Sequence, residues 1–210
     1  MTDRGRLPAQ PLLQAAVAFA VAVLGWLVDL SAALLLLAAL AVVWPPAVAW
    51  MPLRPWSVLR AYVPFALGWL LFVIVYLRVL AWCGAPLAPQ PALQMLAVQG
   101  ISAPGFWLQV VGIAVLAPLA EELLFRGYLF TALRGLLSRT ATHVLTAAAF
   151  GLVHGVGYAL PIGLLSLLFA WLRERECALA PAALAHSLHN GLTVLVTVAW
   201  PAYLDLLYPR

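Results

Sequence analysis

Long apolar runs recur along the whole chain, and short breaks that contain proline, glycine or charge separate them. The run 32–43 consists of Ala, Leu and Val only, so it lacks the alternation typical of membrane β-barrel strands. A helix that spans a bilayer needs about 20 apolar residues. The pattern predicts about seven spanning helices, within a range of six to eight, at residues 11–28, 30–50, 61–82, 106–130, 141–157, 160–172 and 178–200.

Some boundaries of these spans follow from proline and from length. The second span is expected to end near Pro45 and Pro46, and the 86–102 stretch has room for a re-entrant or interfacial helix. We interpret 1–210 as a single integral membrane domain. Its motif-bearing core covers about 106–200, and the spans within 11–82 are accessory.

Composition supports this class and excludes others. Of the 210 residues, 66% are hydrophobic and 9% are charged. An average soluble domain has roughly 45–50% apolar and about 25% charged residues. A soluble enzyme, a disordered chain and a nucleic-acid binder are therefore excluded, and no nucleic-acid partner is expected. The predicted fold is an all-α, polytopic transmembrane helical bundle whose partners include membrane lipids.

The basic residues predict the orientation of the chain in the membrane. All eleven are arginines, and eight of them fall in alternate loops or before the first span: Arg4, Arg6, Arg54, Arg60, Arg134, Arg139, Arg173 and Arg175. By the positive-inside rule this places the N-terminus in the cytoplasm. Arg78, near the outer end of the third span, and Arg210 are exceptions. The all-arginine, compact chain with short loops is typical of a bacterial cytoplasmic (inner) membrane protein.

Two adjacent carboxylates are the only acidic residues inside an apolar span. An ionisable group near the bilayer centre costs at least about 2.5 kcal/mol, so Glu121 and Glu122 both require partners. Glu122 and Arg126 have i, i+4 spacing and can form an ion pair on one helix face. Glu121 points about 100° away from Glu122 and must face a polar cavity, a proton or another polar group. Pro118 can kink the helix and open a pocket beside Glu121.

Two other spans carry polar side chains that could meet this pair. His186 and Asn190 share a helix face at i, i+4 spacing, whereas His189 lies off the centre of that face. His154 lies between Gly151 and Gly155, a small-xxx-small pair that lets another helix approach closely. Taken singly, each can be an ordinary buried polar residue. Together they can converge on one site if the helices bundle.

The order EExxxR, FxxxH, HxxxN on successive apolar helices resembles the CPBP (Abi) family of intramembrane proteases. This family contains the CAAX prenyl endopeptidases and bacteriocin-processing and bacteriocin-immunity proteins. The motifs are Glu121-Glu122-x-x-x-Arg126, Phe150-x-x-x-His154 and His186-x-x-x-Asn190, and the resemblance covers about 118–191.

The resemblance implies a role for each motif residue. Glu121 would act as general base on a water that His154 positions and polarises, and His186 and Asn190 would stabilise the oxyanion of a glutamic-type peptidase. The remaining members of the motifs would support the site: Glu122, Arg126 and Phe150.

A zinc site is the alternative within the enzyme class. Glu121, His154 and His186 plus a water would match the usual open catalytic zinc arrangement, although no HExxH is present. The resemblance favours a metal-independent mechanism, so neither a metal nor another cofactor is expected.

Three hypotheses about the function follow from these residues. The first is an intramembrane endopeptidase that cuts a protein or peptide near its C-terminus or close to the membrane. The second is a non-catalytic peptide-binding or bacteriocin-immunity member of the same family. The third is a small proton-coupled transporter, for which inverted repeats with broken helices would be expected. For the first hypothesis, a bacteriocin precursor or a surface protein with a membrane-anchoring tail is a better candidate substrate than a prenylated protein.

Overall fold

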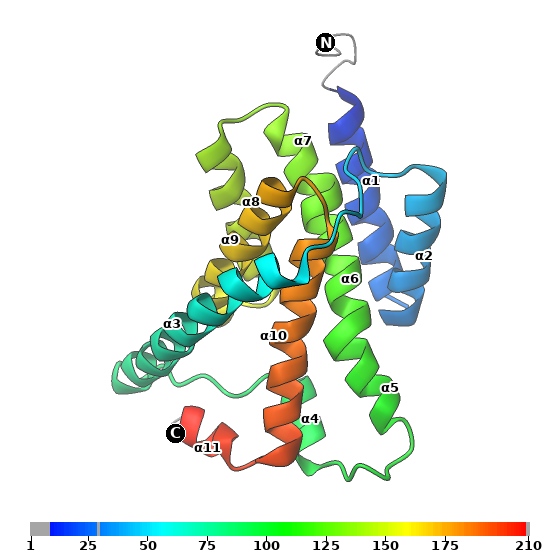
Figure 1. Ribbon diagram of the computed structural model, residues 1–210. Coiled ribbons are helices and arrows are strands. Elements are labelled where there is room, and N and C mark those ends of the chain that lie inside the picture. The colour runs from blue at the N-terminus through cyan, green and yellow to red at the C-terminus, as the bar shows by residue number, and fades with distance from the viewer. Residues whose placement is uncertain (1–8, 29, 209–210) are drawn as a thin grey trace.

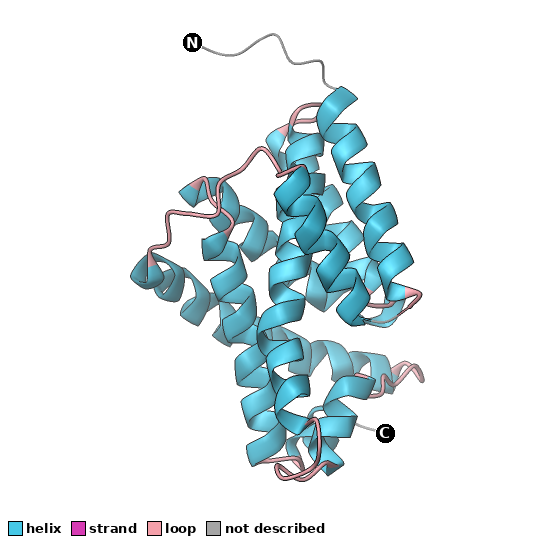
Figure 2. Cartoon of the chain, turned by 90° about the vertical axis from the view of Figure 1, so that its right-hand side faces the viewer, coloured by secondary structure: helices cyan, strands magenta, loops and turns pink. Residues whose placement is uncertain are grey.

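The structure is a computed structural model that describes residues 9–28 and 30–208, and over this range it contains helices but no strand (Figures 1 and 2). Its elements in chain order are α1 (Ala9–Trp26), α2 (Leu30–Val43), α3 (Pro55–Trp82), α4 (Pro91–Val98), α5 (Phe106–Val111), η1 (Gly112–Leu116), α6 (Ala117–Glu122), η2 (Leu123–Leu129), α7 (Phe130–Arg134), α8 (Arg139–Val153), η3 (Val156–Tyr158), α9 (Ala159–Glu176), α10 (Ala180–Ala199) and α11 (Tyr203–Leu207). Elements η1 and η2 are π-helical, and η3 is a 3-10 turn.

The helices are those of an integral membrane protein. Within the described part of the chain, four helical stretches are long and apolar enough to cross a bilayer: Pro55–Trp82, Phe106–Arg134, Val156–Glu176 and Ala180–Ala199. Three of the seven predicted spans correspond to the shorter helices α1, α2 and α8, which have 18, 14 and 15 residues. The predicted all-α membrane bundle is thus confirmed.

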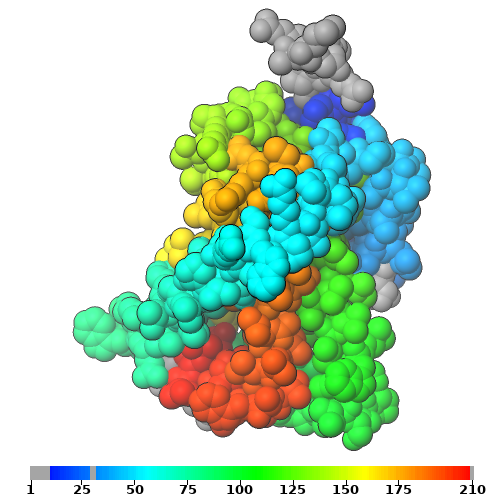
Figure 3. Space-filling model, viewed as in Figure 1, coloured from blue at the N-terminus to red at the C-terminus, as the bar shows by residue number. Residues whose placement is uncertain are grey.

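Two helices occupy the middle of the bundle. The rod that runs from α5 to α7 lies beside α10, and the α1–α2 hairpin flanks the rod on the side away from α10 (Figure 1). Helices α8 and α9 pack on each other, and α3 runs obliquely across them and projects from the body (Figures 1 and 3). Two clusters of buried apolar side chains hold this arrangement, one between α1, α2 and the rod and one between α3, α9 and α10.

Several predicted boundaries are wrong by a few residues. The second span ends at Val43, close to the end expected from Pro45 and Pro46, which lack backbone N–H donors, but other ends differ from the prediction. Helix α9 continues to Glu176, four residues beyond the predicted end. The 86–102 stretch holds the eight-residue helix α4, which packs on α10.

Arg134 and Arg139, two of the arginines predicted to share one side of the membrane, lie at the same end of the bundle. Glu174 at the end of α9 lies 3.3 Å from Arg134 Nε and 2.6 Å from Arg139 Nε. At the opposite end, Arg78 donates to the Leu206 carbonyl of α11 at 3.0 Å. Two of the arginines used to predict the orientation, Arg4 and Arg6, lie outside the described residues, as does the exception Arg210.

The two glycines around His154 have different roles. A Cβ added to Gly151 would lie 2.2 Å from the Ala159 carbonyl oxygen, so this glycine permits close backbone contact between α8 and α9. Gly155 has φ of +102°, and a Cβ added there would meet nothing within 4 Å. It therefore forms a turn that ends the helix at Val153, and the predicted span 141–157 is too long.

Substitution of Gly151 by Ala tests the close contact between α8 and α9. We expect G151A to lower the midpoint of thermal unfolding in detergent by about 2–12 °C, since overpacking costs ~1–3 kcal/mol. The matched control is G68A on α3, where a Cβ meets nothing within 4 Å. Equal midpoints for the two variants would contradict the predicted contact.

Candidate functional site

Glu121 and Glu122 lie on α6 and occupy different environments. The Glu122 side chain is fully buried, whereas the Glu121 side chain is 30% exposed. Helix α6 lies between the π-helical segments η1 and η2, and such segments are frequent at functional sites. Adjacent carboxylates on one helix therefore differ in burial, as their angular separation predicts.

Arg126 neutralises Glu122 in the protein interior. Its Nη1 lies 2.9 Å from Glu122 Oε1, so the ion pair predicted from the i, i+4 spacing is present. Arg126 Nη2 donates to both the carbonyl and the hydroxyl of Ser166 on α9, at 3.0 and 2.6 Å. The guanidinium also lies over the Phe150 and Phe169 rings, 4.6 and 5.4 Å from their centroids.

His186 on α10 connects the two carboxylates. Its Nδ1 lies 2.9 Å from Glu122 Oε1, and since that carboxylate is paired with Arg126, it accepts a hydrogen bond from Nδ1–H. The ring stacks on Phe169 with centroids 4.7 Å apart, which holds its orientation. The other ring nitrogen, Nε2, lies 3.7 Å from Glu121 Oε2.

His154 faces Glu121 from the end of α8. Residue 154 is the C-cap of this helix, and its Nδ1 lies 2.7 Å from the Phe150 carbonyl. A carbonyl oxygen only accepts, so Nδ1 carries the proton and Nε2 of the neutral ring carries a lone pair. This Nε2 lies 3.8 Å from Glu121 Oε2. The Phe150 ring packs beside His154, with centroids 4.8 Å apart.

Asn190 lies near the same site but is partly engaged elsewhere. Its Nδ2 donates to the Ile113 carbonyl in η1 at 3.0 Å. In a π-helix this carbonyl would bond the N–H of residue 118, which is Pro118 and has none. Asn190 therefore supplies the donor that the proline removes, and one of its two amide hydrogens remains available.

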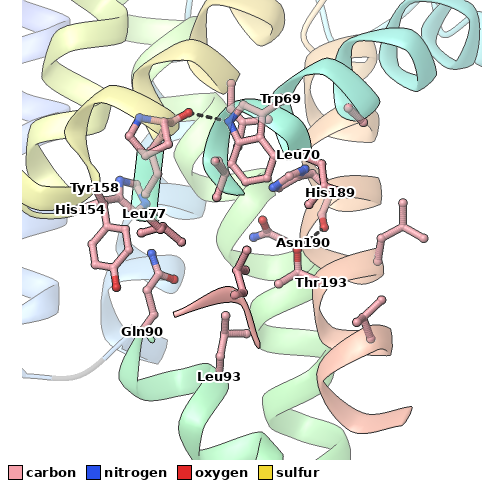
Figure 4. Close-up of a pocket in the computed structure, with 18 of the residues that line it drawn as sticks. Trp69, Leu70, Leu77, Gln90, Leu93, His154, Tyr158, His189, Asn190 and Thr193 are labelled. Atoms are coloured by element: carbon pink, nitrogen blue, oxygen red, sulfur yellow. Dashed lines mark hydrogen bonds between the residues drawn. The ribbon is translucent and has the colours of Figure 1, made fainter. Parts of the chain in front are cut away.

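These side chains line a cavity of about 630 Å³ that lies between α3, α9 and α10 (Figure 4). The close-up shows His154, His189 and Asn190 around the cavity, with Trp69 and Tyr158 in its walls. Its lining includes Glu121, His154, His186 and Asn190 from the predicted set. Glu122 and Arg126 are buried behind these residues and do not line the cavity. Phe150 is also buried but contributes to the lining.

Sequence reasoning missed two residues that contact this set and two that contact the neighbouring His189. On α9, Ser166 accepts a hydrogen bond from Arg126, and Phe169 stacks on His186. On α3, Tyr62 is within hydrogen-bond distance of His189, and the Trp69 ring packs edge-on against it. Ser166 is the one hydroxyl side chain in the run 159–172, which is a signal that could have found it. The other three are aromatic residues in apolar helices, and their spacing does not separate them from core residues.

The three residues of the zinc alternative can be located in the structure. Among the described residues, no group of three or more His, Cys, Asp or Glu side chains is arranged to hold a metal ion. Glu121, His154 and His186 nevertheless converge, since Glu121 Oε2 lies 3.8 Å from His154 Nε2 and 3.7 Å from His186 Nε2.

Removal of one member of the buried ion pair tests its role in stability. We expect R126M to lower the free energy of unfolding by at least ~3 kcal/mol, because Glu122 is then left buried without its cation. The double variant E122L/R126M removes both charges and is expected to recover more than half of this loss. Reversible unfolding in mixed detergent measures both.

R134M is the matched control for R126M. Arg134 is 40% exposed and pairs with Glu174 near the end of the bundle, so its loss is expected to change stability by less than ~1 kcal/mol. A double variant as unstable as R126M would show that the unpaired charge is not the cause.

Comparisons with known proteins bear on the same segment. Residues 103–192 match a family model described as Rce1-like, type II CAAX prenyl endopeptidase. This segment contains all three motifs and confirms the resemblance to the CPBP family, while α1 to α4 lie outside it. Neither a curated protein nor a solved structure matches the chain.

Proposed function

We propose that this chain, Rce1-like over residues 103–192, is an intramembrane endopeptidase that uses Glu121 to activate water. The observation that carries the proposal is the convergence of two imidazoles on one carboxylate oxygen. Glu121 Oε2 lies 3.8 Å from His154 Nε2 and 3.7 Å from His186 Nε2. This constellation lies in a cavity that is otherwise largely apolar.

The distances suit a water between these groups. Separations of 3.7–3.8 Å are too long for direct hydrogen bonds, but one water can bridge such atoms. The lone pair of His154 Nε2 accepts one water hydrogen, and Glu121 Oε2 accepts the other. This leaves an oxygen lone pair of the water directed at a substrate carbonyl.

Glu121 is better suited than Glu122 to act as the base. Glu122 is fully buried, and its Oε1 already accepts from Arg126 and His186. Glu121 is partly exposed to the cavity and has both imidazole neighbours beyond hydrogen-bond distance. Glu122 and Arg126 thus position His186, and Glu121 carries the proton.

The reaction proceeds through a tetrahedral intermediate. Glu121 takes a proton from the water as its oxygen bonds to the peptide carbonyl carbon, and the carbonyl oxygen becomes an oxyanion. The free amide hydrogen of Asn190 donates to this oxyanion. In this proposal His186 enters the step already as an imidazolium, donates from Nδ1–H to Glu122 and from Nε2–H to the oxyanion, and keeps both protons throughout. The C–N bond then breaks, and Glu121 returns the proton to the leaving amine.

The substrate and the orientation belong to the same proposal. The enzyme cleaves near the C-terminus or the membrane-proximal part of a protein or peptide, such as a bacteriocin precursor or a surface protein with an anchoring tail. The end of the bundle that carries Arg134 and Arg139 faces the cytoplasm of a bacterial cell, with the chain in its inner membrane.

Substitution of Glu121 by Gln tests the general base. We expect E121Q to lower cleavage of a membrane-anchored reporter in liposomes by at least about 10²-fold, the lower end for general-base catalysis. Its unfolding midpoint should stay within a few degrees of wild type, because Gln has the same size and the imidazole neighbours of Glu121 lie beyond hydrogen-bond distance. Mass spectrometry of the products measures cleavage.

E174Q is the matched control, since it makes the same change far from the cavity and should retain cleavage. Full activity in E121Q would refute the glutamate mechanism. Loss of wild-type activity on treatment with a chelator, with recovery on addition of zinc, would instead support the zinc alternative. Binding of the reporter without cleavage by the wild type would support a non-catalytic protein.

A second variant separates the two roles of Asn190. N190A removes both the oxyanion donor and the donor to Ile113, so it is expected to lose cleavage and to lower stability by about 1–3 kcal/mol. P118A restores a backbone N–H that can bond Ile113. We therefore expect N190A/P118A to regain stability but not cleavage, as measured by unfolding and by reporter hydrolysis. Recovery of both would show that Asn190 is structural.

A further inference from the structure

A second cavity adjoins Glu121 and His154 on the other side of α6. It has a volume of about 370 Å³ and lies between the α1–α2 hairpin and the rod. The first cavity is lined by residues of α10 and the second by residues of α1 and α2. Glu121 and His154 line both, so these two residues lie where the cavities meet.

Small side chains create the second cavity. Ala117, Ala120, Glu121 and Leu124 form one face of the rod at i, i+3, i+4 and i+7 spacing, and all four line the cavity. Two further alanines line it from the hairpin, Ala22 on α1 and Ala33 on α2. Four alanines on facing helices leave a space that larger residues would fill.

The hairpin that closes this cavity is tightly packed. A Cβ on Gly25 would lie 2.4 Å from the Ala33 Cα, so α1 and α2 are in backbone contact at this point. Such contact between helices is typical of small residues in membrane proteins. The α1–α2 contact therefore fixes the two helices that form this wall of the cavity relative to each other.

The lining of the cavity selects for hydrocarbon. Apart from Glu121 and His154, every lining residue is apolar, and three are aromatic: Phe19, Trp26 and Phe125. The volume lies within the range of about 300–1,000 Å³ that is usual for ligand sites. Val23 and Trp26 at its edge are 54% and 70% exposed, so the cavity opens toward the outside of the bundle.

The position of the polar pair favours a side chain over a lipid as the occupant. A side chain that fills the cavity lies beside Glu121, which activates the attacking water. That side chain therefore belongs to a substrate residue next to the cleaved bond. The larger cavity, which also holds His186 and Asn190, then takes the peptide backbone and its carbonyl.

We infer that the α1–α2 hairpin forms a specificity subsite for a bulky apolar side chain adjacent to the scissile bond. The inference rests on the proposed function and assigns a role to a hairpin outside the Rce1-like segment. Substrates with Leu, Phe or Trp at that position are preferred over those with Ala or a charged residue.

The test compares two cavity variants with opposite effects. A single-span reporter is cleaved in liposomes, its site is mapped by mass spectrometry, and the flanking residues are changed through Ala, Leu and Trp. A22F fills the cavity and is expected to reduce cleavage of the Leu and Trp reporters at least 10-fold relative to the Ala reporter. L34A enlarges it and is expected to raise the preference for Trp.

A39F is the matched control for A22F, because Ala39 is exposed on the outer face of α2. It is expected to leave both cleavage and side-chain preference as in wild type. Unchanged preference in A22F and L34A, with cleavage retained, would overturn the subsite and leave the protease assignment standing. An inactive wild type would instead overturn the protease assignment.

A second measurement does not depend on cleavage. In the E121Q variant, a reporter with photo-leucine at the proposed position is expected to cross-link to residues 19–26 or 33–37, and A22F is expected to block this. Absence of these cross-links would overturn the subsite. Equal labelling of these residues by a C10 alkyl diazirine in vesicles without reporter would show that lipid chains fill the cavity and would also overturn it.

Discussion

The buried contact between Arg126 and Glu122 organises the rest of the bundle. A charge of either sign is very unfavourable in the apolar interior of a membrane protein, so each side chain requires partners. Arg126 draws Ser166 of α9 and the Phe150 ring of α8 to the rod, and Glu122 draws His186 of α10. One ion pair thus connects four helical elements. It also fixes the ring of His186, whose second nitrogen faces Glu121.

The convergence of the polar residues could be predicted from the sequence because few solutions exist for them. Glu121, His154, His186 and Asn190 each require a polar neighbour in an apolar span, and bundled helices offer only one another. The end of α8 was harder to predict than this convergence, although Gly155 directly after His154 is a recognisable helix stop. A contact such as that of Asn190 with Ile113 depends on the axial position of one helix relative to another. The spacing of residues along the sequence does not predict this position.

Proline and asparagine on different helices act together at η1. Pro118 leaves the Ile113 carbonyl without its helical donor, and Asn190 supplies one from α10. The π-helical segment is thereby tied to the helix that carries His186. Sequence alone predicts a kink at Pro118, whereas the structure has a local π-helical segment that keeps the rod continuous from Phe106 to Arg134.

Helix α3 is too long for an upright position in a bilayer. Its 28 residues rise about 42 Å, compared with about 30 Å for the hydrocarbon layer. The oblique course of α3 across the bundle (Figure 3) shortens its projection on the membrane normal. Because Tyr62 and Trp69 of α3 form a wall of the larger cavity, a thicker or thinner membrane would tilt that wall. The lipid composition of the host membrane thereby becomes a determinant of the shape of the site.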